Sequence, residues 1–440
     1  MPDNTSIADI DEQCDVLVIG GGPGGSTAAT LLARQGLAVT QVEKTHHPRF
    51  HIGESLLPMN LPVFGRLGVL DKVRELGVFK AGADFEADNE RGYNTFAFAR
   101  ALDGSPPHAF QVWRADFDKM LFDHAREAGA DGRQGQQVVA VEHHGARDHR
   151  ARVRREDGRE YVIQARYLLD ASGRDALLAS RKKIRHKNPE HQSAAIFGHF
   201  HHAVARAGED AGNISIYNFD HGWMWMIPLP DGVMSVGAVC RPDYLKTRRG
   251  RDNREFLHET LALNPAVAER MRDAQLIDDK IHVTGNYSYK SETLGGPGWM
   301  LVGDAFAFLD PVFSSGVYLA MSGAEQIVEV VMQALDKPAG EARAQRQLEK
   351  RLRAGMARMA FFIYRFNSPV MQQMFREPRN TWKVEQGVIS MLAGDVFDSR
   401  PVWWRLQLFR GIYGLCVLRD WRRWRAENRY RHQQARATFE

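Results

Sequence analysis

The chain has 440 residues, 44% of them apolar, which is enough for two or three subdomains around an ordinary hydrophobic core. Its 58 basic and 54 acidic residues leave a net charge of only +4, which gives no reason to expect a nucleic acid partner. The three cysteines, Cys14, Cys240 and Cys416, follow no metal-binding spacing, so we expect free thiols in a reducing compartment rather than a disulfide framework or a metal site.

The N-terminal dozen residues are polar and acidic and lack the basic and apolar regions of a secretory signal. No uninterrupted apolar run approaches the ~18 residues of a membrane-spanning helix. The sequence therefore predicts a cytoplasmic protein without a membrane span.

Residues 15–43 read as a strand, a glycine-rich turn, a helix and a second strand that ends in a carboxylate. In the turn, Gly20 allows a tight bend, Gly22 lets a pyrophosphate approach the backbone, and Gly25 lets the helix pack against the strand. The start of the helix offers unpaired N–H groups to an anion, and Glu43 is placed to bind ribose hydroxyls. Because strand, helix and carboxylate agree, we predict a dinucleotide site rather than a purely structural turn.

Three polar residues further along have both a plain and a functional interpretation. Ser55 belongs to the loop 48–58, which is either a surface connection or a segment lying along the cofactor. Lys80 is expected in a loop between two glycines, where a lysine is usually solvated. Arg114 ends a strand that leads into a helix, and it is either a surface cation or a bidentate partner of a pyrophosphate.

Short runs of alternating apolar and polar residues between 193 and 239 predict an antiparallel sheet. Trp223 and Trp225 lie two residues apart in one of these runs, so their rings point to the same face of the sheet. That face is either core or the wall of a site for a flat substrate.

A third feature follows the apolar strand at 299–302, where Gly303 and Asp304 form a turn and a helix begins at about Ser315. The backbone N–H groups of Ser315 and Gly316 at this helix start are suited to an anion, and the alternative is a plain capped helix.

Residues 341–440 are predicted to be helical. From Arg405 to the end there are nine arginines against three acidic residues, with Trp421 and Trp424 among them and Trp403 and Trp404 just before. This basic, aromatic terminus fits a solvated closing helix, a dock for an acidic partner protein, or a contact with a membrane surface.

Taken together, these motifs resemble the FAD-dependent monooxygenase superfamily with the p-hydroxybenzoate hydroxylase type of fold, over about residues 15–332. The resemblance implies a mixed α/β fold: a Rossmann-like FAD-binding domain with an inserted antiparallel β-sheet substrate domain and a helical C-terminal region. The expected divisions are 1–110, 111–185 and 293–340 for the FAD-binding part, 186–292 for the substrate domain and 341–440 for the helical region. The residues that carry the resemblance are Gly20-x-Gly22-x-x-Gly25, Gly53-Glu-Ser55, Arg114 in Val-Trp-Arg-Ala-Asp-Phe-Asp, Asp170-Ala-Ser-Gly173 and Gly303-Asp304.

Two further motifs narrow the resemblance to flavin-dependent halogenases. Residues 223–228 match the pattern WxWxIP, and residues 308–316 match the pattern FxxPxxSxG. Lys80, in Lys-x-Gly-Ala-x-Phe, falls at the catalytic lysine of that family. Tryptophan halogenases carry a glutamate where this chain has Phe313. The sequence of this motif therefore resembles that of the phenol and pyrrole branch, and we do not expect free tryptophan as the substrate.

The resemblance implies that FADH2, delivered by a separate flavin reductase, reacts with oxygen and thereby oxidises chloride or bromide to hypohalous acid. Halide would bind at the backbone of Ser315 and Gly316, and the hypohalous acid would travel to Lys80, which passes electrophilic halogen to an electron-rich aromatic ring, free or bound to a carrier protein. The expected cofactor-binding residues are Gly20, Gly22, Gly25, Glu43, Ser55, Arg114, Asp304, Gly316 and Val317. The expected substrate and channel residues are Trp223, Trp225, Phe308, Pro311 and Phe313.

Three alternatives stay open from the sequence: a flavin hydroxylase, a flavin-dependent reductase of double bonds, and a non-enzymatic flavin-binding scaffold. As a possible partner contact, arginines from Arg405 to Arg436 would bind an acidic acyl carrier protein that presents the substrate.

Overall fold

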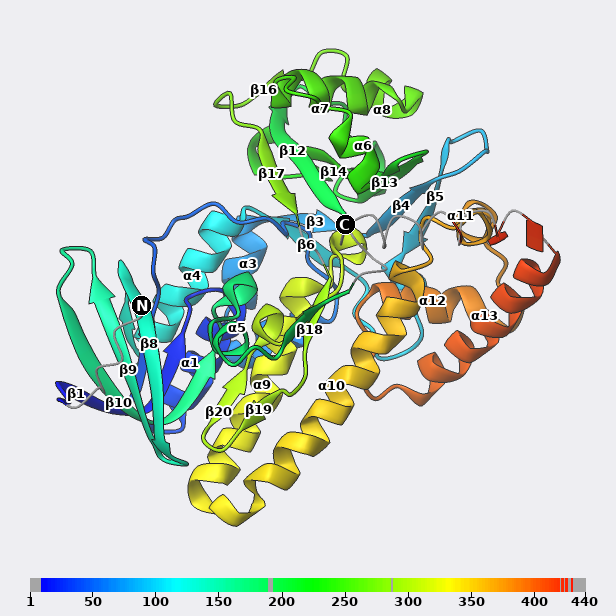
Figure 1. The fold of residues 1–440 in the computed structure, drawn as a ribbon. Helices are drawn as coiled ribbons and strands as arrows, with labels where there is room; N and C mark the ends of the chain where they lie inside the picture. Colours follow the sequence, from blue (N-terminus) through cyan, green and yellow to red (C-terminus); the bar gives the residue numbers. More distant parts are fainter. Residues whose placement is uncertain are drawn as a thin grey trace.

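The computed structural model describes residues 9–188, 193–285 and 288–419, and residues 421, 422, 424, 425 and 429 beyond them (Figure 1). It confirms the predicted fold class of a mixed α/β chain with a Rossmann-like part, an antiparallel sheet and a helical C-terminal region. The domain boundaries expected from the sequence stay a prediction.

The Rossmann-like part is built on a sheet with the strand order β19-β20-β10-β1-β2-β7. Strand β1 pairs in parallel with β2 and β10, and β20 continues the parallel set beside β10. The apolar run predicted as the first strand forms β1, and its buried side chains meet those of β10 in one core. The bounds are β1 (Glu12–Ile19), β2 (Val39–Val42), β7 (Asp131–Arg133), β8 (Gln136–Gly145), β9 (Asp148–Arg155), β10 (Glu160–Asp170), β19 (Gly295–Gly296) and β20 (Trp299–Leu301).

Helices α1 (Pro23–Arg34), α4 (Arg114–Glu127) and α9 (Gly316–Asp336) are packed around this sheet (Figure 1). The glycine-rich turn joins β1 to α1, as predicted. Beyond the second strand, the chain forms two short helices, α2 (Asn60–Leu67) and α3 (Leu70–Leu76). They are separated by Gly68, which caps α2 with a left-handed φ of 74°.

The second large sheet has the order β16-β12-β15-β14-β13-β4-β5, with β17 beside β12. It is antiparallel except for the pair β13 and β4, and it confirms the antiparallel sheet predicted after residue 193. Its bounds are β4 (Gly82–Glu86), β5 (Tyr93–Ala97), β12 (Ala194–His201), β13 (Ile214–Phe219), β14 (Gly222–Pro228), β15 (Met234–Cys240), β16 (Gln275–Leu276) and β17 (His282–Gly285).

Side-chain alternation gives this sheet two apolar faces. One packs with the helices that cover it at the top of Figure 1, α6 (Pro242–Lys246), α7 (Asn253–Ala262) and α8 (Pro265–Arg270). The other shares a core with the C-terminal helices and with both tryptophans of β14. The C-terminal helices therefore cover this second face of the sheet.

Smaller elements connect the two large sheets. Strand β3 (Gly77–Lys80) pairs with β6 (Ala109–Val112), and β18 (Tyr289–Ser291) lies between β11 (Arg185–Lys187) and β21 (Ala307–Phe308). The short helix α5 (Leu177–Arg181) follows the end of β10. The prediction of a loop around Lys80 was wrong, since this residue ends β3 and pairs with Ala109 of β6.

The C-terminal region is helical as predicted, as far as the structure describes it: α10 (Glu341–Ile363), α11 (Pro369–Arg376), α12 (Val384–Leu392) and α13 (Arg400–Arg419). Most of the arginine-rich segment after Arg419, including Arg436, lies outside the described residues. Within the described chain, we find no helix whose length and apolarity would suit a bilayer span.

Candidate functional site

A cavity of about 440 Å³ lies between the Rossmann-like part and the second large sheet. Its lining combines segments that are far apart in the sequence, from the glycine-rich turn to the start of α9. Twelve of the predicted site residues lie on its wall: Gly20, Gly22, Glu43, Ser55, Arg114, Trp223, Trp225, Asp304, Phe308, Pro311, Gly316 and Val317. The fold thus brings together the residues predicted for cofactor and substrate.

The glycine-rich turn forms one end of the cavity. Gly20 has a φ of 115°, and a Cβ added there would overlap the backbone carbonyl of Ala171. A Cβ at Gly25 would overlap the carbonyl oxygen of Gly20, so this glycine lets α1 pack against the end of β1. At Gly22 a Cβ would meet only Arg49, at 3.7 Å, so the space in front of this residue is open toward the cavity.

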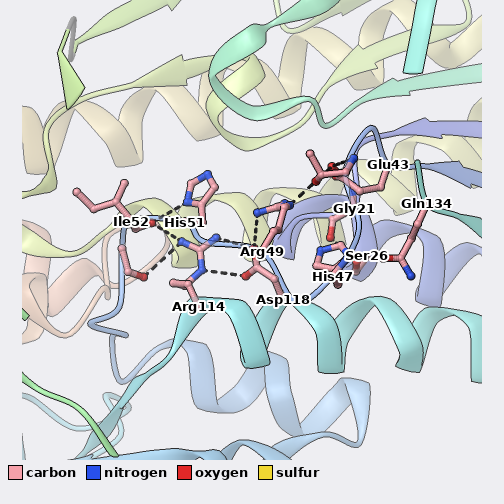
Figure 2. A network of polar contacts seen from close by, with 12 residues as sticks. Gly21, Ser26, Glu43, His47, Arg49, His51, Ile52, Arg114, Asp118 and Gln134 are labelled. Atoms are coloured by element: carbon pink, nitrogen blue, oxygen red, sulfur yellow. Dashed lines mark hydrogen bonds and ion pairs between the residues drawn. The ribbon is translucent and has the colours of Figure 1, made fainter. Parts of the chain in front are cut away.

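Glu43 is held at the same end by its own surroundings. One carboxylate oxygen accepts the N–H of Gly21 at 2.7 Å, and the other accepts the N–H and the hydroxyl of Thr45 at 3.0 and 2.7 Å (Figure 2). Burial raises the pKa of Glu43, but Arg49 and these donors outweigh burial and leave the pKa below its usual value. The carboxylate is therefore ionised and fixed next to the turn.

Arg114 makes most of its contacts inside the protein. Its guanidinium donates to both carboxylate oxygens of Asp118, at 2.8 and 3.0 Å, and to the carbonyl oxygen of Ile52 at 2.6 Å (Figure 2). These bonds fasten the loop 49–55 to the start of α4. The expected bidentate contact of Arg114 with a pyrophosphate stays a prediction.

Sequence reasoning missed Arg49, which lies in the same network (Figure 2). Its Nη1 is 3.3 Å from a carboxylate oxygen of Asp118, its Nε is 3.7 Å from Glu43, and its side chain lines the cavity beside Gly22. A cation at this position faces the space where the turn would receive a diphosphate. The signal in the sequence was a lone arginine six residues after Glu43, in a loop judged only as a connection.

Asp304 faces both the main cavity and a smaller one beside it. Burial raises the pKa of this carboxyl to about 6, although Arg114 and Arg174 act against the rise. Among the described residues, none donates a hydrogen bond to the carboxyl oxygens. Asp304 therefore offers a buried acceptor to a hydroxyl-bearing ligand.

The tryptophan pair of β14 lies on the cavity wall and in the core at once. Trp223 and Trp225 are both buried, with ring centroids 5.8 Å apart, and the indole N–H of Trp225 donates to Ser235 at 3.3 Å. Their common orientation confirms the prediction from strand geometry. The pair thus belongs to the core and also lines the cavity, and its role as the wall of a substrate site stays a prediction.

Lys80 is 1% exposed, and its Nζ donates to the hydroxyl of Ser55 at 2.8 Å and to the carbonyl of Leu56 at 3.0 Å. The ring of Phe98 lies 5.3 Å from Nζ, and no carboxylate of the described residues comes within 4 Å of it. Burial lowers the pKa of Lys80 to about 7. Lys80 does not line the 440 Å³ cavity itself, but it contacts that cavity's wall through Ser55.

The segment before α9 divides between two cavities. Pro311 and Val317 line the main one, Ser315 lines a neighbouring cavity of about 30 Å³, and Phe308 and Gly316 line both. Phe313 lines neither of these two and packs in the core against Phe366 and Phe375.

The comparisons with known proteins agree with this site. A family model described as FAD binding domain matches residues 13–361. The solved structure of the myxobacterial chondrochloren halogenase CndH, a variant of FAD-dependent halogenases, is 30% identical and covers 90% of this chain and 96% of that one, with a TM-score of 0.76. The chain belongs to the flavin-dependent halogenase family.

Two other relatives extend the comparison. A tryptophan 2-halogenase of Chondromyces crocatus is 38% identical over 313 residues, which are 70% of this family member and 59% of that protein. The chain thus matches about three fifths of the length of that relative. A flavoprotein/dehydrogenase structure from Cytophaga hutchinsonii is 27% identical and covers 93% of this chain and all of that one, with a TM-score of 0.83.

The residues of this family member fit FAD. The open space at Gly22, the neighbouring Arg49 and the start of α1 suit the pyrophosphate, and Glu43 suits the ribose of the adenosine half. Asp304 has the free acceptor that a ribityl hydroxyl needs.

The raised pKa of Asp304 predicts pH-dependent binding of FAD. The ionised carboxylate is the better acceptor for a ribityl hydroxyl, so protonation below pH 6 should weaken binding. With a pKa of about 6 in the free protein, we expect the Kd for FAD to be about tenfold higher at pH 5 than at pH 7. Titration followed by flavin fluorescence measures this change. The variant Asp304→Asn should bind FAD weakly, and its Kd should no longer change between pH 5 and pH 7. A pH-independent Kd in the unmodified protein would contradict the assignment.

Proposed function

We propose that this chain uses FADH2, oxygen and chloride or bromide to halogenate an electron-rich aromatic substrate, with Lys80 as the catalytic residue. The observation that carries the proposal is Lys80 itself: an amine that is completely buried, has no carboxylate partner among the described residues, and is hydrogen-bonded to a residue on the wall of the FAD cavity. A lysine with a pKa near 7 exchanges between ammonium and amine at neutral pH. An ammonium polarises hypohalous acid, and an amine can carry the halogen.

Reduced FAD, when bound, supplies the electrons that activate oxygen for the oxidation of halide. Gly22, Glu43, Arg49 and Asp304 would hold and orient the cofactor. The small cavity at Ser315 and Gly316 is suited in size and in backbone N–H groups to a single halide ion.

The tryptophan pair would separate the flavin from the substrate. Trp223 and Trp225 occupy the cavity wall that belongs to the substrate sheet, so an aromatic ring beyond them would not reach the flavin. A hypohalous acid that leaves the flavin side could then be held by Lys80 at Nζ and directed to the ring. As the carbon–halogen bond forms, the oxygen–halogen bond of the hypohalous acid would break, and its hydroxyl and the ring proton would leave as water.

For the substrate we propose a phenolic or pyrrole-like ring, free or bound to a carrier protein. Phe313, at the place where tryptophan halogenases carry a glutamate, supports this choice because it packs in an aromatic core and offers no charge to an indole. The relative from Chondromyces crocatus bears the name of a tryptophan halogenase, so tryptophan belongs among the substrates to be tested. A flavin reductase is the expected partner, and a cytoplasmic location stays a prediction.

The test combines the purified chain with a flavin reductase, NADH, FAD, oxygen and bromide, and a panel of phenols, pyrroles and tryptophan. Mass spectrometry should find products with the isotope pattern of bromine, formed only when both bromide and the chain are present. Products that gain oxygen instead would favour the second candidate, a flavin monooxygenase or another flavin oxidoreductase. The close structural match to a flavoprotein/dehydrogenase supports that candidate.

A further inference from the structure

The outer side of helix α13 is apolar although it faces solvent. The helix lies at the edge of the molecule, beyond α12 (Figure 1). At 100° per residue, the side opposite its buried residues carries Trp404, Gly411, Leu415 and Leu418, which we call the outer strip, and the same side also carries Gln407 and Arg400. Trp404 is 60% exposed, Leu415 68% and Leu418 70%. The buried side consists of Val402, Leu406, Phe409 and Tyr413.

Positive charge flanks the outer strip on both sides. Helix α13 contains four arginines and no acidic residue, and the helical geometry places Arg410 on one flank and Arg405 and Arg419 on the other. Among the described residues, no carboxylate lies within 4 Å of Arg405 or Arg410. Burial lowers the pKa of Arg410, and so do the nearby cations Arg365 and Arg358.

Further aromatic and basic side chains follow the end of α13. Trp421 is 46% exposed and stacks on Trp424 with centroids 5.6 Å apart, and the guanidinium of Arg425 lies 5.8 Å from the ring of Trp421. Tryptophan, leucine and arginine on one exposed helix face are typical of helices that lie in a lipid interface.

We propose that the outer strip of α13 binds the surface of a membrane that contains anionic lipids. Leucine and tryptophan side chains enter the boundary between headgroups and acyl chains, while the flanking arginines reach the lipid phosphates. Pairing with a second copy of the chain would bring two sets of arginines together, and these repel each other. An acidic protein could pair with the arginines. Its charge would not explain why three large apolar side chains are exposed to 60% or more.

The inference is tested by flotation of the full chain with vesicles of phosphatidylcholine alone and of phosphatidylcholine mixed with phosphatidylglycerol. We expect binding to the mixed vesicles only, and weaker binding at high salt. The variant Trp404→Ser/Leu415→Ser/Leu418→Ser should bind the mixed vesicles at least about tenfold less tightly. Arg405→Gln/Arg410→Gln should lose about tenfold as well.

The matched control replaces exposed apolar residues elsewhere. Trp382 and Leu263 are 73% and 52% exposed and lie outside α13, so Trp382→Ser/Leu263→Ser should bind vesicles like the unmodified chain. All variants should bind FAD unchanged, which shows that they fold and keeps this test independent of the halogenase activity.

Three results would overturn the inference. The first is the absence of flotation with mixed vesicles. The second is a dimer in analytical ultracentrifugation that the triple variant abolishes. The third is that the chain does not bind vesicles but binds an acidic acyl carrier protein, and that the same substitutions abolish this binding.

Discussion

Replacing Lys80 by methionine should lower the yield of halogenated product by at least about 100-fold while leaving the oxidation of reduced flavin unchanged. Lys80 is proposed to act after halide has been oxidised, so its loss should uncouple flavin consumption from product formation. The measurement is the ratio of brominated product to NADH consumed in the coupled assay with the reductase.

The structure argues that Lys80→Met will fold. The side chain is fully buried, and burial already disfavours its charge, so an unbranched apolar side chain of similar length suits the site. The cost is confined to the Ser55 hydroxyl and the Leu56 carbonyl, which lose a donor, and we expect a change in unfolding free energy within about 2 kcal/mol.

An exposed lysine away from the cavity gives the control. Lys182 also has a pKa lowered by burial, and its Nζ lies over an aromatic ring, that of Trp299 at 5.0 Å, but it is not on the cavity wall. Lys182→Met should keep the product yield of the unmodified chain. If Lys80→Met also keeps that yield, the residue is a structural lysine and the catalytic proposal is wrong.

The pH dependence follows from the same residue. The folded-state pKa of Lys80 is about 7, so its ammonium is present below this pH and is lost as the pH rises through it. If the ammonium polarises hypohalous acid, the product yield per NADH should fall as the pH rises from about 6 to about 8. A rise over this range would instead indicate that the neutral amine carries the halogen.

The elements that could be predicted from the sequence are those that local pattern determines. Strand β1, the turn after it and α1 follow from an apolar run, three spaced glycines and helical periodicity, and the alternating runs after residue 193 predict their sheet for the same reason. The common orientation of Trp223 and Trp225 could be predicted from the two-residue repeat of a strand alone.

The features that could not be predicted from the sequence depend on contacts between distant segments of the chain. The sequence predicts a solvated Lys80 because this residue lies between two glycines in an expected loop, whereas its burial comes from β6, Phe98 and the loop at Ser55. Arg49 lies at the site because the loop after Glu43 places its side chain close to both Glu43 and Asp118 of α4. Neither contact leaves a periodic trace in the sequence.

Replacing Gly25 by alanine should disrupt both folding and FAD binding, because the added Cβ would overlap the carbonyl oxygen of Gly20. Both atoms belong to rigid backbone, so α1 or the end of β1 must shift. Overpacking of this kind costs about 1–3 kcal/mol, and we expect a lower melting temperature together with a Kd for FAD raised at least about tenfold. Gly65→Ala is the control, since Gly65 lies in α2 with open space at its Cβ and alanine favours helix by about 1 kcal/mol.

Gly22→Ala separates the structural role of the turn from its role in binding. An added Cβ there meets only Arg49, at 3.7 Å, so the unfolding free energy should change by less than about 0.5 kcal/mol. The same Cβ occupies the space in front of the turn where the pyrophosphate would approach the backbone, so the Kd for FAD should still rise at least about tenfold. Thermal unfolding without FAD and fluorescence titration with FAD give the two values. A Gly22→Ala protein that binds FAD like the unmodified chain would mean that the diphosphate lies elsewhere, and the assignment of Glu43 and Arg49 to the cofactor would fail with it.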